Sequence, residues 1–235
     1  MFPISDEDQA GRRHPSYVTW AIIILNVLVF LYEVMLGSGV QQVISTYGVV
    51  PREILTGQDL PPPGPYPLYL QLLTSMFLHA GWLHLIGNMA YLRVFGDDIE
   101  DALGPVFYLL FYLGAGLVAS LTHILISGPG SAVPSIGASG AIAGVLGAYL
   151  VLYPQRRVHV LLPSYALATA RVSALVMLGF WFILQFLNGI AALTSQTAES
   201  GGVAVWAHVG GFVAGAIVGL LLRGTTTVRQ QALSR

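Results

Sequence analysis

The chain has 235 residues, of which 55% are hydrophobic and only 9% are Asp, Glu, Lys or Arg. Soluble domains carry about 25% of these charged residues, so the composition excludes an ordinary soluble protein and predicts an integral membrane protein. The formal net charge of -1 says nothing about nucleic acid, and no basic cluster suggests it, so no nucleic acid partner is expected. The lack of cysteine excludes disulfides and thiol nucleophiles.

Six apolar ranges follow one another along the chain, each near the length of a membrane-spanning helix. They cover residues 17-37, 80-96, 105-127, 138-153, 172-193 and 203-222. The first could also be a signal peptide, but its length and the lack of an Ala-x-Ala site after it favour a retained helix. We therefore predict an all-α, polytopic bundle of six transmembrane helices over residues 17-222, with cytoplasmic tails at 1-16 and 223-235.

Arginine placement predicts the orientation, because cytoplasmic loops of membrane proteins collect positive charge. In a six-span arrangement only Arg52 falls on the outer side. The other nine arginines fall on the cytoplasmic side: Arg12, Arg13, Arg93, Arg156, Arg157, Arg171, Arg223, Arg229 and Arg235. Both termini are therefore predicted to be cytoplasmic. The acidic group Asp97, Asp98, Glu100 and Asp101 is expected to form a solvated cytoplasmic turn, and Glu33 to be exposed at the interface.

Ser139 lies in Gly137-Ala138-Ser139-Gly140-Ala141, at the predicted outer start of the fourth span. Glycines allow a tight turn from loop to helix, and amides at a helix N-terminus would stabilise a developing oxyanion. From Ser139 to Pro154 is about 22 Å of helix, shorter than the roughly 30 Å hydrocarbon core. Ser139 is thus predicted to lie below the outer surface in a wet pocket. Taken alone, however, this motif is more often a small residue that eases helix packing.

His208 lies near the predicted outer start of the sixth span, at a depth that matches Ser139. Small faces run along both spans, formed by Gly140, Gly144 and Gly147 on the fourth and by Gly211, Gly215 and Gly219 on the sixth. Packing of these faces would bring His208 within hydrogen-bonding reach of Ser139, whose proton an imidazole could accept. The alternative is a purely structural hydrogen bond. No acidic residue is placed to orient His208, so a dyad is expected rather than a triad.

Two further polar residues, His84 and Asn88, are four residues apart and share a face of the second span. Both can donate hydrogen bonds to an oxyanion. A metal site built from His79, His84 and His208 is the alternative, because imidazole is a common zinc ligand. It lacks a His-Glu-x-x-His pattern and a carboxylate ligand at this depth.

With these motifs in order on successive spans, the chain resembles the rhomboid family of intramembrane serine proteases. The resemblance covers about Leu72 to Gly219. It is carried by Thr74-Ser75-Met76-Phe77-Leu78-His79, His84-x-x-x-Asn88, Gly96 with Glu100 and Gly104, Gly137-Ala138-Ser139-Gly140, and His208 with Gly211, Gly215 and Gly219.

The resemblance implies a rhomboid-like fold and a serine endopeptidase with Ser139 and His208 as its catalytic dyad. His84, Asn88 and the Ser139 amide would form the oxyanion site. Structural roles would fall to His79, Gly137, Gly140, Gly211, Gly215 and Glu100. It further implies transmembrane protein substrates that enter from the lipid bilayer between the second and fifth spans, and no metal or cofactor. The compact layout suggests a bacterial plasma membrane.

Two departures from the family pattern stand out. Leu70-Gln71 replaces a Trp-Arg pair that many members carry in the first loop, and Ala143 replaces an aromatic residue that often supports the catalytic histidine. Aromatic residues of the fifth span, Trp181 among them, suit either a movable gate or an ordinary lipid face. The alternative function is a non-catalytic rhomboid-like protein that binds unstable membrane helices in quality control.

Overall fold

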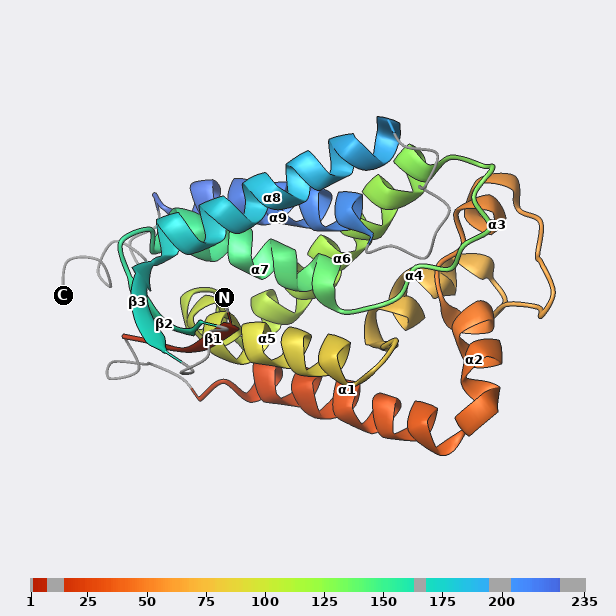
Figure 1. Ribbon diagram of the computed structural model, residues 1–235, viewed down its shortest axis with the longest axis horizontal. Helices are drawn as coiled ribbons and strands as arrows, with labels where there is room; N and C mark the ends of the chain where they lie inside the picture. Colours follow the sequence, from red (N-terminus) through yellow and green to blue (C-terminus); the bar gives the residue numbers. More distant parts are fainter. Residues whose placement is uncertain (1, 8–14, 163–167, 195–203, 225–235) are drawn as a thin grey trace.

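The structure is a computed structural model that describes residues 2–7, 15–162, 168–194 and 204–224, and the chain it describes is mostly helical (Figure 1). The helices are α1 (Tyr17–Met35), α2 (Val40–Tyr47), α3 (Pro51–Thr56), α4 (Gln71–Thr74), α5 (Trp82–Leu103), α6 (Pro105–Ser127), α7 (Ser139–Leu152), α8 (Ala174–Thr194) and α9 (Val205–Leu222). The strands are β1 (Phe2–Asp6), β2 (Arg157–Leu161) and β3 (Thr169–Ser173). Most of the predicted tails, with Arg12, Arg13, Arg229 and Arg235, lie outside the described residues.

Each of the six predicted spans contains a helix, but the helices are not equivalent. In the described residues, α1, α6, α8 and α9 are long and apolar enough to cross a membrane. α7 has only 14 residues, about 21 Å of helix, and α5 ends in a group of acidic side chains. The structure therefore supports four candidate spans, and the count of six remains a prediction.

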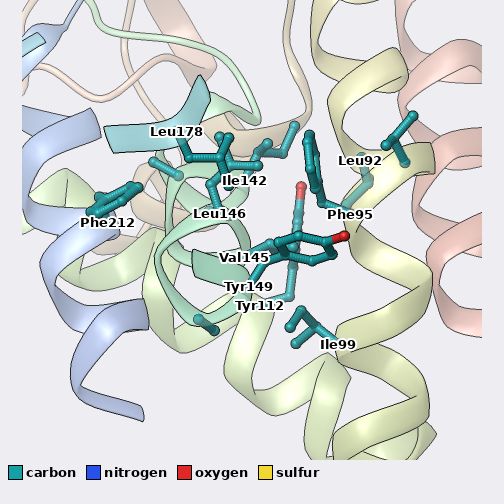
Figure 2. Close-up of a cluster of buried hydrophobic side chains, with 14 of the residues drawn as sticks. Leu92, Phe95, Ile99, Tyr112, Ile142, Val145, Leu146, Tyr149, Leu178 and Phe212 are labelled. Atoms are coloured by element: carbon teal, nitrogen blue, oxygen red, sulfur yellow. The ribbon is translucent and has the colours of Figure 1, made fainter. Parts of the chain in front are cut away.

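The hydrophobic core is built around α7, which lies between α5 on one side and α8 and α9 on the other (Figure 1). Nearly every α7 side chain is buried. Figure 2 shows Ile142, Val145, Leu146 and Tyr149 of α7 packed among side chains of the surrounding helices, such as Phe95. A helix that is apolar all round needs such an enclosed position. Ser139, its first residue, is consequently carried into the interior of the bundle.

Glycines bring α7 and α9 into backbone contact. A Cβ atom at Gly211 would overlap the carbonyl oxygen of Gly140, and one at Gly215 would overlap that of Gly144. The two predicted small faces therefore pack against each other. Such close approach is how transmembrane helices associate without a hydrophobic driving force.

A small antiparallel sheet of order β1-β2-β3 lies at one end of the helical bundle (Figure 1). The prediction of an all-α fold missed it, so the fold is mostly helical. Each strand has five residues, and β1 pairs with a strand more than 150 positions away. Short strands joined over that separation leave no local pattern in the sequence.

The acidic group at the end of α5 is buried, so the expectation of a solvated turn is wrong. The exposed fractions of Asp97, Asp98, Glu100 and Asp101 are 7%, 4%, 1% and 8%. Glu100 accepts hydrogen bonds from the backbone N–H groups of Val18 and Thr19, at 2.9 and 2.7 Å, and so caps the start of α1. Its partners are 82 and 81 positions away in the sequence, which is why the local pattern looked solvated.

A buried ion-pair cluster ties the sheet to the same end of α5. Arg156 Nη1 lies 2.6 Å from Asp98 Oδ1 and 3.7 Å from Asp6 Oδ2. Tyr149 donates its hydroxyl to Asp6 Oδ2 at 2.6 Å, and the Arg156 guanidinium lies 3.7 Å from the centre of the Tyr153 ring. β1, α5 and α7 are thereby held together by one cation.

Candidate active site

Ser139 is the first residue of α7, at the end of an irregular segment that protein surrounds. Ser135 exchanges two backbone hydrogen bonds with Val49, and the Gly137 N–H donates to the Ser75 carbonyl at 2.8 Å. Arg52 donates from its guanidinium to the carbonyls of Pro129 and Gly130, at 3.3 and 2.7 Å. These partners satisfy backbone groups that lipid could not, as irregular structure at membrane depth requires.

Ser139 and His208 meet at the α7–α9 contact. The distance from Ser139 Oγ to His208 Nε2 is 2.7 Å, a hydrogen bond in the range for a hydroxyl donor. His208 is 6% exposed, and its position follows from the close approach of Gly211 to Gly140. The arrangement is that of a hydroxyl nucleophile beside a general base.

His84 and Asn88 lie beside Gly137, two residues before Ser139. Gly137 has φ +123°, and a Cβ there would lie 2.8 Å from His84 Nε2 and 3.8 Å from Asn88 Nδ2. The Ala80 N–H donates to His84 Nδ1 at 3.4 Å, so a neutral His84 carries its proton on Nε2. That N–H and the Asn88 amide are therefore donors beside Gly137, two residues before Ser139.

His79 is a hydrogen-bond partner of Asn88. Asn88 Nδ2 lies 3.0 Å from His79 Nε2, and His79 Nδ1 lies 3.3 Å from the Phe77 carbonyl oxygen. A carbonyl only accepts, so His79 is protonated on Nδ1 and accepts from Asn88 on Nε2. An amide nitrogen carries two N–H groups, which lets Asn88 bond His79 and still donate elsewhere.

Glu33 of α1 completes this support, contrary to the expectation that it is exposed. It is 2% exposed, and its carboxyl oxygens lie 3.2 and 3.3 Å from the His79 backbone N–H. The sequence places Glu33 near the end of an apolar run, which is typical of an interfacial residue. Burial arises because the first loop folds back over α1.

The first loop, which connects α1 to α5, is anchored by Gln71, a member of the Leu70-Gln71 pair that departs from the family pattern. Gln71 is fully buried; its Nε2 donates to Glu53 Oε2, and its Oε1 accepts from the Val50 N–H at 3.4 Å. Glu53 is itself 1% exposed. This hydrogen-bonded pair joins α3 to α4 and anchors the loop without an arginine.

Two residues of α8 contact His208: Gln185, which was not predicted from the sequence, and Trp181, which was expected in a gate or on a lipid face. Gln185 Oε1 lies 3.0 Å from His208 Nδ1. The Trp181 ring lies 5.7 Å from the His208 ring between centroids, so this aromatic faces the site rather than lipid. A polar residue in an apolar span was the available signal, because such residues usually face the protein interior.

A small cavity lies beside Ser139, with a volume of about 20 Å³. Hydroxyl side chains from three segments line it, those of Ser75, Ser120 and Ser135. One water molecule needs about 10–15 Å³ by this kind of measure, together with polar partners. The cavity can therefore hold a water next to the serine.

The metal alternative finds no support in the part of the chain that the structure describes. No three His, Asp or Glu side chains there are grouped so that they could hold an ion. His79 Nε2 and His208 Nε2, two of the proposed ligand atoms, instead contact Asn88 and Ser139.

Comparison with known proteins gives the family. A model described as the rhomboid domain matches residues 68–225, a range that includes Ser139, His208 and the residues of α5 and α8 that surround them. This chain belongs to the rhomboid family. A rhomboid of this kind is an integral membrane protein, in keeping with the four apolar helices. The family includes intramembrane proteases that act on membrane proteins.

Among the relatives, one is named as a protease and another is named as inactive. This rhomboid is 30% identical to the rhomboid protease GluP of Bacillus subtilis over 207 residues, 86% of this chain and 35% of that protein. It is 31% identical to RHOMBOID-like protein 5 of Arabidopsis thaliana over 152 residues, 65% and 43% of the two chains. Inactive RHOMBOID-like protein 8 of Arabidopsis thaliana is 30% identical over 132 residues, 56% and 34%. The matched region is less than half the length of each relative.

Proposed function

We propose that this rhomboid is an intramembrane serine endopeptidase with Ser139 as nucleophile and His208 as general base. The observation that carries the proposal is the 2.7 Å hydrogen bond between Ser139 Oγ and His208 Nε2 at the α7–α9 contact. A serine hydroxyl is a weak nucleophile until a neighbouring base can take its proton, and this contact supplies the base.

The reaction follows from that geometry. Ser139 Oγ attacks the carbonyl carbon of a peptide bond while its proton passes to His208 Nε2. The tetrahedral intermediate collapses as His208 returns the proton to the leaving amine, and an acyl-enzyme forms. Water then attacks the ester with His208 again as base, which releases the new carboxylate and restores Ser139.

The oxyanion site of this proposal consists of three donors around Gly137: the Ser139 backbone N–H, His84 Nε2–H and the Asn88 amide. They come from the start of α7 and from one face of α5, which the Asn88–His79 bond holds in place. Prepositioned donors stabilise the charge that develops on the carbonyl oxygen, and one donor is commonly worth ~100- to 1,000-fold in kcat. The cavity of about 20 Å³ beside Ser139 is suited to the water that cleaves the acyl-enzyme.

The membrane arrangement we propose has six spans, with α5 and α7 added to the four long apolar helices. The charged end of α5 then lies in the cytoplasm, and short α7 begins below the outer surface. Arg156, Arg157, Arg171 and Arg223 lie at the sheet end of the bundle or at the end of α9, which supports cytoplasmic termini and tails at 1-16 and 223-235. We place the protein in a bacterial plasma membrane.

The proposed substrates are single-span membrane proteins with helix-weakening residues near the scissile bond. They reach Ser139 laterally, between α5 and α8. The exposed aromatic side chains of α8, Phe180 at 52% and Phe186 at 42%, suit a helix that faces lipid. The mechanism uses no metal and no cofactor.

The experiment that tests this function is labelling of the purified protein with a fluorophosphonate, which reacts with activated serines. Wild-type protein should be labelled, and both Ser139→Ala and His208→Ala should abolish the label. Ser38→Ala is the control, because Ser38 is an exposed serine that does not line this cavity. Labelling that survives Ser139→Ala would place the reactive serine elsewhere.

One observation favours a second function. A relative 30% identical over 132 residues is named as inactive, so a non-catalytic protein that binds membrane helices is the alternative. It predicts well-folded wild-type protein that fluorophosphonate does not label, together with capture of an unstable single-span helix that Ser139→Ala leaves unchanged.

A further inference from the structure

α8 directs two side chains at the imidazole of His208. Gln185 Oε1 lies 3.0 Å from His208 Nδ1, and the Trp181 ring lies 5.7 Å from the imidazole at an interplanar angle of 40°. Trp181 and Gln185 are four positions apart, so they share one face of the helix. We propose that Gln185 is a positioning residue, which holds His208 in the tautomer and orientation that catalysis by Ser139 requires. This inference rests on the proposed function.

The contact selects one tautomer of His208. A carbonyl oxygen can only accept a hydrogen bond, so Nδ1 must carry the proton where it meets Gln185 Oε1. A neutral imidazole has one N–H, and Nε2 therefore presents its lone pair to Ser139 Oγ, 2.7 Å away. The opposite tautomer would point an N–H at Oγ and could not accept the serine proton.

α7 offers no substitute for this support. One turn after Ser139 stands Ala143, a fully buried methyl group that can neither accept a hydrogen bond nor stack on a ring. The aromatic surface against His208 is supplied from α8 instead, by Trp181, whose ring also lies 6.1 Å from that of Phe212. In this chain the histidine is thus positioned by α8.

The surroundings of Gln185 show why its amide points inward. Its neighbours Ile183, Leu184 and Leu187 are 55%, 42% and 54% exposed, on the outside of the bundle where lipid would lie. A polar side chain in such a helix is costly unless it finds a partner within the protein. His208 is that partner, and the hydrogen bond stabilises both residues.

The kinetic test compares Gln185→Leu with Asn188→Leu, a control that makes the same kind of change at an exposed position of α8. Gln185→Leu should lower kcat ~10-fold, which corresponds to the loss of about one net hydrogen bond, and leave KM unchanged. Asn188→Leu should match wild type. Thermal unfolding in detergent, monitored for each variant, shows whether the protein is folded.

A second variant, Gln185→Glu, keeps an acceptor oxygen at the same place. It should restore most of the kcat lost in Gln185→Leu. Its carboxylate favours the protonated imidazolium, so the acid limb of the kcat/KM profile should move to higher pH. Equal loss in the leucine and glutamate variants, or an unmoved profile for Gln185→Glu, would overturn the proposal.

A readout that does not need activity separates this inference from the proposed function. In Ser139→Ala protein labelled with ¹⁵N-histidine, the ring nitrogens of His208 should report the Nδ1–H tautomer by NMR. His208→Ala identifies the signals. Adding Gln185→Leu should shift the population toward Nε2–H. An unchanged tautomer would contradict the role of Gln185 even if the enzyme is active, and a shifted one would support it even if no proteolysis is found.

Discussion

At the scale of single residues, the site depends on groups that take no part in the chemistry. Ser139 and His208 are 69 positions apart in sequence and meet within 2.7 Å. Gly137 is the clearest of the supporting residues, because its φ of +123° disfavours any side chain and its Cα–H faces the His84 ring. The position of the His84 donor therefore depends on the absence of a Cβ atom at residue 137.

Gly137→Ala tests that dependence. The added Cβ would lie 2.8 Å from His84 Nε2 and would have to push the ring away from the serine. We expect kcat to fall by ~100-fold, the cost of one lost oxyanion donor. Gly130→Ala is the control from the same segment, because a Cβ there meets no described atom within 4 Å. Equal activity of the two variants would show that His84 is not needed where it lies.

The contact between the two proposed reacting residues was easier to predict from the sequence than the contacts that hold them in place. Ser139 and His208 stand in glycine motifs at helix starts, and their pairing follows from matching small faces. Gln185 has no such motif; its role follows only from the distance between α8 and α9. Glu33 and Gln71 were likewise hidden, because their partners, His79 and Glu53, lie in a loop whose path the sequence does not reveal.

At the scale of secondary structure, the α7–α9 contact positions the dyad. Gly215 lies at its centre, two turns of helix below His208, and any Cβ there overlaps the Gly144 carbonyl. Gly215→Ala should force the helices apart, lower the thermal unfolding midpoint in detergent and reduce fluorophosphonate labelling of Ser139.

The control for Gly215 is Gly114→Ala in α6, where a Cβ meets no described atom within 4 Å. Replacing glycine by alanine in an exposed helix usually stabilises it by ~1 kcal/mol, so the control should be at least as stable as wild type. A Gly215→Ala variant that is as stable and as reactive as Gly114→Ala would refute close packing of α7 and α9.

A second prediction at the scale of secondary structure concerns Arg156, which joins the sheet to α5. Arg156→Leu leaves the buried carboxyl groups of Asp6 and Asp98 without this cation, and breaking such a pair typically costs 3–5 kcal/mol. The thermal unfolding midpoint should fall clearly. Arg171→Leu removes an arginine whose side chain is 63% exposed and whose ion pair with Glu7 spans 3.7 Å; it should change stability by less than ~1 kcal/mol. Similar midpoints for both variants would contradict the buried cluster.

Helix positions were predictable, whereas tertiary burial was not. Hydropathy located the six ranges because apolar runs of that length leave few alternatives. The acidic residues after Gly96 were mistaken for a solvated turn, since their partners at Thr19 and Arg156 are remote in sequence. β1 and its pairing were missed for the same reason.

At the scale of the whole molecule, the protein places the proposed hydrolytic site inside an apolar bundle. α7 is shorter than the hydrocarbon core of a bilayer is thick, so as a span it would begin below the outer surface, and the first loop encloses the segment before it. Irregular backbone, a water-sized cavity and the dyad thus lie together in the interior. We attribute the low charge content and the buried polar contacts of this rhomboid to the need to enclose this site within a membrane bundle.

The most direct test of the dyad is cleavage of a single-span model substrate by the full chain reconstituted in lipid vesicles. We predict cleavage within or beside the membrane segment by wild-type protein and none by folded Ser139→Ala or His208→Ala, with Ser38→Ala, at an exposed serine outside the site, close to wild type. Turnover at the wild-type rate in either dyad variant would contradict the account.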